Sequence, residues 1–459
     1  MKQKTLIIIS LIVSFVCVFS CQRNNTITPV DFPQNLGIEG FNFPEDSMNI
    51  YGWLENRDTI AITEHAWGIW AGLTQPTNQT YQGQKLLVFE TWHGVQELAA
   101  MSAQGQVADE TSVKTSRTDL QVPRQFTHAA LLTSASGVDT NFQVLETVCY
   151  DPSASKFVTQ NKLFNQSTLQ SFTVENGFGS IPDFPNSAIT LKPTYYAGVP
   201  GKGGLIRVPV WQEPSPAKAY RYNQWQSWVY VDPSNSQKSR NIVPVTSDTA
   251  TPEQITQATC NLSDFIHHKI DREAADYLNS HQDVGTTPSR QFVEGDYILL
   301  VAMHVTTKEF KNWTWQTYFW APDPSNPPKP SSKFEASLKP SSLRGAAAHY
   351  AVSTAYAMVW PNQPVTSGSD KGCVPIISYN PYLEGGFGPK VFKQANKFRP
   401  DFVYGMQTNC MSCHALSTLS GKNGYTTNQY IDMMDSNLFL SDVKLDFAWS
   451  IQGNINTDK

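Results

Sequence analysis

Residues 295–320 read GDYILLVAMHVTTKEFKNWTWQTYFW, and they carry two long apolar runs, 295–310 and 312–320. Both runs are rich in β-branched and aromatic residues, which are typical of β-strands. Only a short polar stretch separates them, and two strands joined so closely pair in antiparallel fashion. We therefore expect a long strand pair here.

The rest of the chain shows both strand and helix patterns. Short β-like runs bounded by Pro, Gly, Asn or Asp lie at 143–151, 204–212, 226–233 and 240–248. We expect helices at 62–73, 261–281 and 344–359. The second of these is the most amphipathic, with Leu262, Phe265, Ile266, Ile270 and Ala274 on one side. Together the patterns predict a mixed α+β fold.

Composition limits the classes of partner. The chain has 459 residues and a mass of 51.2 kDa, long enough for two or three domains. Its formal net charge is -5 and charged residues make up only 16% of it. Such a chain has no strong basic field to hold a polyanion, so we expect no nucleic-acid partner.

The first residues resemble a bacterial export signal. Lys2 and Lys4 precede an apolar run from Leu6 to Phe19, which is shorter than a membrane span of about 20 residues. The run ends in VFSC, which resembles the lipobox of bacterial lipoproteins, so Cys21 is the predicted lipidation site. The alternative is an ordinary signal peptide or an uncleaved anchor. We expect a lipid-anchored protein of the cell envelope that faces the periplasm, in the inner leaflet of the outer membrane.

One motif near the C-terminus carries clear chemistry. Residues 409–414 read NCMSCH, and C-x-x-C-H is the attachment pattern of c-type haem. In that pattern Cys410 and Cys413 bind the porphyrin through thioethers, and His414 is the proximal ligand of the haem iron. The motif occurs once, which predicts one covalent haem c per chain. A redox dithiol or half of a zinc site are the alternatives, although no second C-x-x-C is present.

The second axial ligand of the iron has several candidates. Met433 and Met434 follow His414 in the order seen in His/Met cytochromes, whereas His304 or His349 would give a bis-histidine site. An open sixth position is the third alternative. Methionine is also a common core residue, and an isolated histidine on an apolar strand is usually only hydrogen-bonded. The sequence leaves these alternatives open.

Several other residues have more than one interpretation. Trp313, Trp315 and Trp320 fit a plain core, a haem wall or a sugar-stacking surface, with the core favoured. Asp264 and His268 would lie one turn apart on the expected helix, as a solvated pair more readily than as a metal site. Cys149, Cys260 and Cys373 allow at most one disulfide between them, and the sequence does not select the pair.

The motif and the linker signals divide the chain. We expect a signal peptide at 1–20, a tether at 21–40, a mixed α/β upstream domain at 41–320, a Pro- and Ser-rich linker or loop at 321–343, and a haem c-bearing segment at 344–459. The upstream region is β-rich, and the last segment is expected to be mostly helical or loop and cytochrome c-like. That segment is too short around the motif to enclose a haem alone, so the upstream domain should supply part of the pocket.

Several stretches together carry a family resemblance. They are FETWHGVQEL at 89–98, the strand pair of 295–320, NPYLE at 380–384, NCMSCH at 409–414 and KLDFAWSI at 444–451. In these the chain resembles an uncharacterised family of exported bacterial lipoproteins described only as cytochrome c family. The resemblance implies that residues from about 60 to the end form one unit, and it implies no particular reaction.

These features lead to three functional hypotheses. The first is a membrane-anchored monohaem cytochrome that transfers electrons between redox partner proteins of the cell envelope. The second is a haem oxidoreductase, peroxidase- or oxidase-like, with an open distal site built by the upstream domain. The third is a binding module in which the haem is structural or sensory.

Overall fold

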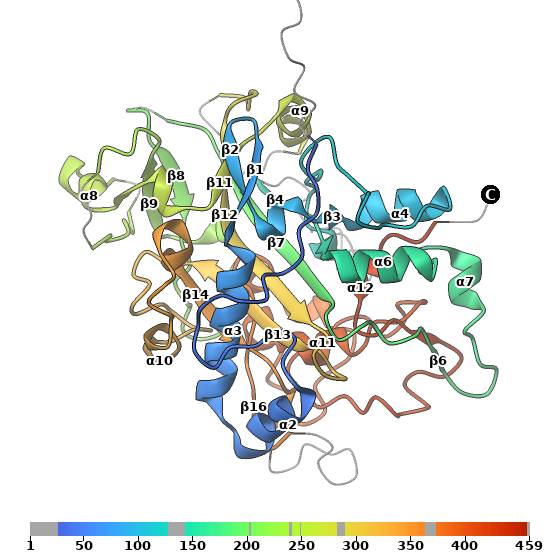
Figure 1. Ribbon diagram of the computed structural model, residues 1–459. Helices are drawn as coiled ribbons and strands as arrows, with labels where there is room; N and C mark the ends of the chain where they lie inside the picture. Colours follow the sequence, from blue (N-terminus) through green and yellow to red (C-terminus); the bar gives the residue numbers. More distant parts are fainter. Residues whose placement is uncertain are drawn as a thin grey trace, which may run out of the picture.

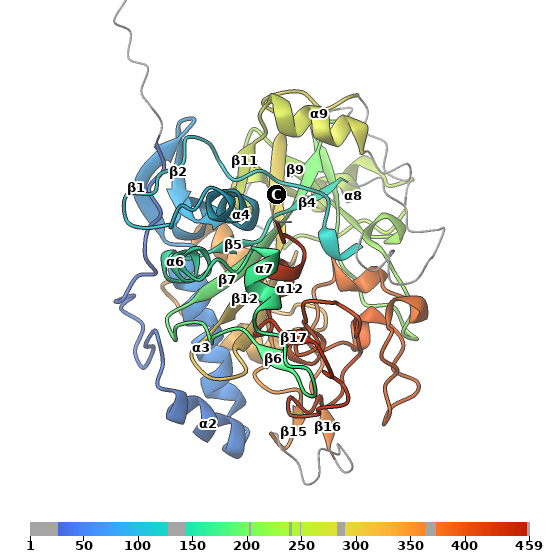
Figure 2. The same ribbon diagram turned by 90° about the vertical axis from the view of Figure 1, so that its right-hand side faces the viewer.

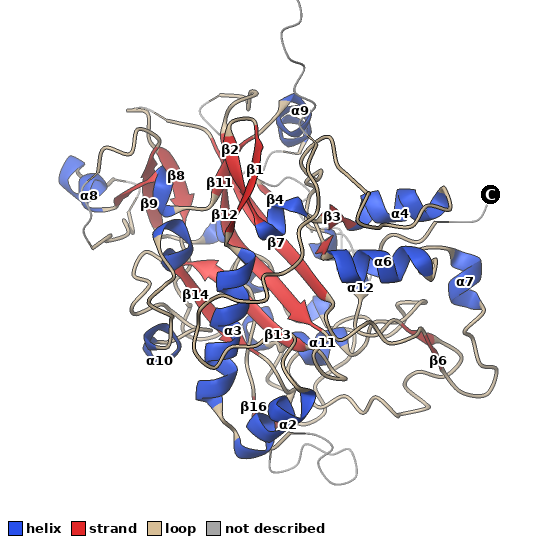
Figure 3. Cartoon of the chain, in the orientation of Figure 1, coloured by secondary structure: helices blue, strands red, loops and turns tan. Residues whose placement is uncertain are grey.

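The computed structural model describes residues 26–126, 143–201, 203–237, 241–247, 249–281, 290–362 and 373–456. Helices and strands both occur throughout these ranges, so the chain has the expected mixed α+β character (Figures 1 and 3). The predicted lipidation site Cys21 lies outside the described residues. Among the described helices, none is both long enough and apolar enough to span a bilayer.

An eight-stranded antiparallel sheet forms the centre of the molecule, as Figure 1 shows. Its main path is β14 (Tyr350–Thr354), β13 (Thr314–Trp320), β12 (Tyr297–Thr307), β7 (Ile189–Gly198), β5 (Cys149–Tyr150) and β3 (His93–Gly94). Two further strands join it, β11 (His267–Lys269) beside β12 and β4 (Val144–Glu146) beside β7. The strand pair predicted over 295–320 is confirmed as β12 and β13, and β12 is the longest strand described.

The two faces of this sheet carry different layers. On one face, Trp70 of helix α3 (Thr59–Leu73) stacks on Tyr318 of β13 with ring centroids 4.4 Å apart, and Tyr318 donates its hydroxyl proton to the Ala66 carbonyl. On the other face, the ring of Trp315 packs against His414, with centroids 4.3 Å apart. Residues 315 and 318 point to opposite faces because side chains alternate along a strand. Figure 2 shows the sheet between the N-terminal helices and the C-terminal region.

Smaller elements surround the sheet. A second sheet contains β8 (Ile206–Pro209), β9 (Trp228–Asp232) and β10 (Thr259–Asn261), and three two-stranded ribbons pair β1 (Pro76–Tyr81) with β2 (Gln84–Leu87), β15 (Val359–Trp360) with β16 (Val374–Pro375), and β6 (Gly179–Ser180) with β17 (Val443–Lys444). The other α-helices are α2 (Ser47–Asn56), α4 (Val95–Ala103), α6 (Pro152–Gln160), α7 (Gln166–Gln170), α8 (Pro252–Gln257), α9 (Arg272–Ser280), α10 (Lys333–Ser337), α11 (Cys410–His414) and α12 (Trp449–Gln452).

Most of the expected elements are present. The aromatic helix expected at 62–73 is α3, and the runs at 143–151, 204–212 and 226–233 contain the strands β4, β5, β8 and β9. The run at 240–248 forms no strand in its described part, where Val245 makes a single bridge to Trp228. The stretch 321–343 is mostly loop around the short helix α10.

The helix expected at 261–281 is wrong in its first half. Residues 259–261 are a strand, and Asp264 accepts a hydrogen bond from the Asn261 backbone amide at 2.8 Å, which closes a single 3₁₀ turn. His268 then pairs with Ile298 of β12, so it does not share a helix face with Asp264. A true helix begins only after Asp271, whose side chain caps the backbone amide of Ala274. Sheet pairing has overridden the amphipathic pattern.

The helix expected at 344–359 is also wrong. Residues 345–349 form a 3₁₀ turn, and Tyr350–Thr354 is the strand β14, which pairs with β13 in the central sheet. The run AVST contains the β-branched residues Val352 and Thr354, which suit a strand. Hydrogen bonds and side-chain contacts with β13 then stabilise the extended form at the edge of the sheet. The C-terminal segment therefore contributes a strand to the sheet of the upstream region. The rest of it is mostly loop, as Figure 3 shows.

Two helical glycines should respond in opposite ways to alanine. A Cβ at Gly72 would lie 2.2 Å from the ring of Phe32, which is buried, whereas a Cβ at Gly52 meets nothing within 4 Å. We expect Gly72→Ala to lower the free energy of unfolding by about 1–3 kcal/mol through overpacking. Gly52→Ala should raise it by roughly 0.5–1 kcal/mol through helix propensity. Urea unfolding of both variants checks this, and equal effects would contradict the packing of Phe32 on α3.

Candidate haem site

The C-x-x-C-H motif forms a single helical turn that is anchored at its start. Asn409 is fully buried, and its side-chain oxygen accepts a hydrogen bond from the Ser412 amide at 2.9 Å. Its amide group donates to the carbonyls of Ala357 and Ile376 at 3.0 and 2.9 Å. Asn409 thus caps the turn and ties it to a segment that lies far away in sequence.

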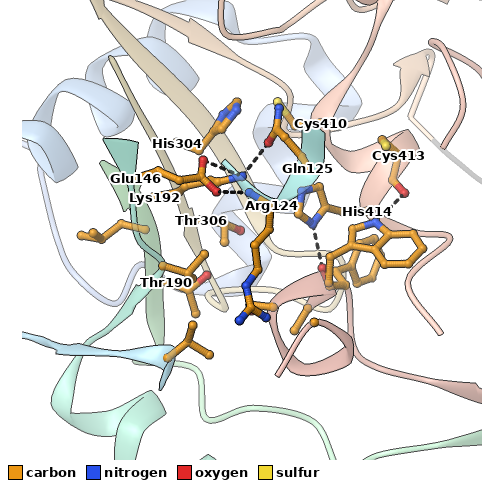
Figure 4. Close-up of a pocket in the computed structure, with 18 of the residues that line it drawn as sticks. Arg124, Gln125, Glu146, Thr190, Lys192, His304, Thr306, Cys410, Cys413 and His414 are labelled. Carbon is orange, nitrogen blue, oxygen red and sulfur yellow. Dashed lines mark hydrogen bonds and ion pairs between the residues drawn. The ribbon is translucent and has the colours of Figure 1, made fainter. Parts of the chain in front are cut away.

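The three motif side chains open into one cavity of about 740 Å³. Pockets for cofactors and small molecules typically have volumes of roughly 300–1,000 Å³. Figure 4 shows Cys413 and His414 on one side of the cavity, opposite Thr190, Lys192 and Thr306 of the central sheet. The cavity is therefore lined by both the upstream region and the C-terminal segment, as the shortness of that segment led us to expect.

His414 is held in the state that a metal ligand needs. Its Nδ1 lies 2.8 Å from the carbonyl oxygen of Phe447, so Nδ1–H donates there and Nε2 carries the lone pair. The described residues offer Nε2 no hydrogen-bond partner. Burial lowers the pKa of His414 to about 4, so the imidazole is neutral at pH 7. A neutral histidine whose far nitrogen is fixed by a carbonyl is the usual arrangement of a metal-bound histidine.

The two cysteines are free thiols in surroundings that disfavour the thiolate. Burial raises the pKa of Cys413 to about 12 and raises that of Cys410 further. A reactive dithiol needs a lowered thiol pKa. A thioether carries no charge, so the same surroundings do not penalise it. Among the described residues no three His, Cys, Asp or Glu side chains are grouped to hold a metal ion, so the second half of a zinc site is not found there.

Of the four candidate second ligands, only His304 lines the cavity. Met434 is exposed over 69% of its surface. Met433 packs against the apolar cluster that also contains Trp313 and Trp315, but it does not line the cavity, and its carbonyl accepts a hydrogen bond from Lys444. His349 stacks on Trp320 and lies 3.6 Å from Asp264, away from the motif. His281, which the sequence analysis did not consider, also lines the cavity.

A charged network covers the sheet side of the cavity, and the sequence analysis missed it. Lys192 Nζ lies 3.0 Å from the Glu146 carboxylate and 2.5 Å from the side-chain oxygen of Gln125. The Gln125 amide donates to Glu384 at 2.8 Å, and His304 Nε2 lies 3.3 Å from the same carboxylate. Figure 4 shows the part of this network that joins Glu146, Lys192 and Gln125.

The pKa values of the two carboxylates of the network are shifted in opposite directions. Burial raises the pKa of Glu146, and Lys192 offsets only part of that effect. Burial also acts to raise the pKa of Glu384, but the neighbouring His304 and the hydrogen bonds from Asn380 and Gln125 bring it below its ordinary value. Glu384 is therefore ionised at neutral pH. Glu384 belongs to the NPYLE stretch, whose chemistry the sequence alone does not indicate.

The tryptophans divide between two roles. Trp313 and Trp315 line the cavity, and Trp315 also contacts His414, which fits the interpretation as a wall of the site. Trp320 instead stacks on Phe265 in the core, with centroids 4.2 Å apart. No disulfide forms among the three buried cysteines Cys149, Cys260 and Cys373.

Comparison with known proteins adds no assignment to this geometry. No protein-family model matches the chain, and no curated protein or solved structure matches it significantly. The resemblance to the cytochrome c family described above thus remains a prediction.

The cap of the motif turn should be energetically important. Asn409→Ala removes the acceptor of the Ser412 amide and the donors to the carbonyls of Ala357 and Ile376. The Ile376 carbonyl keeps a second donor, Asn428 at 3.0 Å, whereas the Ala357 carbonyl and the Ser412 amide lose the side-chain partner that Asn409 gives them. We expect the substitution to lower the free energy of unfolding by about 2–4 kcal/mol. Urea unfolding measures the change, with Asn437→Ala at an exposed position as the control. A loss of unfolding free energy in Asn409→Ala no larger than that in Asn437→Ala would contradict the anchoring role of Asn409.

Proposed function

We propose that the protein is a monohaem c-type cytochrome, with the porphyrin attached to Cys410 and Cys413 and the iron held by His414. One observation carries the proposal: the three motif side chains open into a single cavity, and the Phe447 carbonyl leaves Nε2 of His414 as its available lone pair. The buried setting of the two thiols fits thioethers better than a reactive dithiol, and no further zinc ligands are grouped with them among the described residues.

The residues of this chain would supply the binding and the electrostatics. Cys410 and Cys413 would hold the porphyrin through thioethers, and His414 would hold the iron. The haem would supply one-electron redox chemistry when bound. Trp313 and Trp315 line the cavity and would shield the haem from water, and the low local dielectric would strengthen the influence of nearby charges on the potential.

The proposed role is electron transfer in the cell envelope. The N-terminal signal and Cys21 would anchor the chain to a membrane and leave the folded part facing the periplasm. Covalent haem attachment also takes place outside the bacterial inner membrane, so the two features agree. Redox proteins of the same compartment would be the partners.

The cavity favours a second candidate, a haem oxidoreductase with an open distal site. Here the network of Glu146, Lys192, Gln125, Glu384 and His304 places charged and proton-bearing groups on the cavity wall. Such groups serve to bind and orient a small substrate.

Covalent haem is the first measurement. The mature chain, expressed with a haem-attachment system and purified, should give a pyridine haemochrome spectrum with one haem c per chain. The haem should remain with the polypeptide after denaturation. The double variant Cys410→Ala with Cys413→Ala should lose it entirely, because no thioether can form. Cys260→Ala, at a buried cysteine outside the cavity, is the control and should keep it. Zinc without iron in the wild-type chain would refute the proposal.

Lipidation can be tested separately. Cells that express the full chain should incorporate radiolabelled palmitate into it, and the protein should sediment with membranes. Cys21→Ser should abolish both, because the thioether lipid has no other site. Cys17→Ser should change neither, since that residue lies within the predicted signal peptide. Label that remains on the Cys21→Ser variant would contradict the lipoprotein assignment.

A further inference from the structure

His304 occupies a special position on the cavity wall. It lies on β12 directly opposite Lys192 of β7 and Thr317 of β13. Thr306, two residues along the same face, pairs with Trp315, which packs on the proximal His414. His304 is thus part of the sheet face that forms the cavity, and its imidazole lines the space into which the motif opens.

One nitrogen of His304 is already committed to a rigid partner. Its Nε2 lies 3.3 Å from both oxygens of Glu384. That carboxylate also accepts from the Asn380 backbone amide at 2.6 Å and from Gln125 at 2.8 Å. The backbone of Glu384 is held as well, because its amide donates a hydrogen bond to the Asn380 carbonyl at 2.8 Å.

This contact decides where the imidazole carries its lone pair. An ionised carboxylate accepts hydrogen bonds, so the Nε2 of His304 bears the proton and Nδ1 bears the lone pair. The described residues offer Nδ1 no hydrogen bond. Binding iron through Nε2 would break the contact with Glu384. Nδ1 is therefore the nitrogen that can accept a proton from a molecule in the cavity, and the only one that can bind iron without breaking that contact. The Glu384 carboxylate would stabilise the resulting imidazolium.

We propose that His304 is the proton acceptor for a small protic ligand in the haem cavity, of the hydrogen peroxide or hydrogen cyanide class. A histidine in this role keeps Nδ1 for the proton and would leave the iron accessible to the ligand. When the ligand enters as its neutral acid, its proton passes to Nδ1 of His304 and its conjugate base remains in the cavity. This inference rests on the proposed covalent haem, and it favours the oxidoreductase over the simple electron carrier.

The experiment uses the purified, haem-loaded mature chain and two probes. Carbon monoxide has no proton to give, so it reports only whether the sixth position is open. Hydrogen cyanide must give up its proton when it binds, so the rate of cyanide association reports whether a proton acceptor is present in the cavity. We expect the wild type to bind both probes. His304→Ala should retain carbon monoxide binding and bind cyanide about 100-fold more slowly, since a positioned acid–base group typically contributes about 10²-fold or more.

Two further variants separate the role of His304 from general damage to the site. Glu384→Gln removes the charge that supports the imidazolium and should slow cyanide association by about tenfold. His349→Ala is the matched control, because this histidine lies beside Trp320 away from the cavity, and it should behave as the wild type.

The spectra of the wild type and of His304→Ala can overturn the inference. A low-spin, six-coordinate haem that excludes carbon monoxide, and that becomes high-spin and open in His304→Ala, would make His304 an axial ligand. An unchanged cyanide rate in His304→Ala would remove its role as proton acceptor. Complete absence of covalent haem would instead refute the proposed function, which keeps the two failures distinct.

Discussion

The alternation of side chains along β12 is the constraint on which both the core and the site depend. From Ala302 to Thr307, successive residues of this 11-residue strand face opposite layers, and the antiparallel partners β7 and β13 both pair with it without interruption. The pairing with β7 shifts by one residue between Leu300 and Ala302. Residues such as Met303 and Tyr318 are therefore directed to the helix-covered face, and His304 and Trp315 to the cavity. A shift of one residue would exchange the two sets, and neither the core nor the site would survive it.

The parts of the fold that sequence could predict are those in which local pattern and tertiary setting agree. The strand pair and the helix α3 are long and have strong hydrophobic patterns. Contacts with neighbouring elements therefore did not alter the secondary structure that the pattern predicts. The segments 261–271 and 350–354 have patterns that suit a helix equally well, and pairing with β12 and β13 decided them. Asp264 closes the 3₁₀ turn and Asp271 caps the start of α9. From sequence alone these two residues could not be recognised as the ends of elements, because the strand between them is set by pairing with β12.

The same division applies to the candidate site. The motif cysteines and histidine follow from spacing, since two thiols and an adjacent imidazole must reach one cofactor. Phe447 could not be predicted as the partner of His414, because it contributes a backbone carbonyl and any residue carries one. Glu384, Lys192 and Glu146 come from three distant segments, and their charges resemble ordinary surface charges until the fold brings them together. Four candidates for the second ligand were therefore open from sequence, and the structure places one of them in the cavity.

The edge strand β14 limits how segments of this chain can be exchanged by recombination. It follows the Pro- and Ser-rich stretch 321–343, which from composition alone would be expected to tolerate a break between two coding segments. A break there would strip the last strand from the sheet and leave the outer backbone of β13 unpaired, and exposed strand edges promote aggregation. A recombination event that replaced the C-terminal segment with another would therefore have to supply a strand that pairs with β13. The upstream region and the C-terminal segment are for this reason expected to be inherited together.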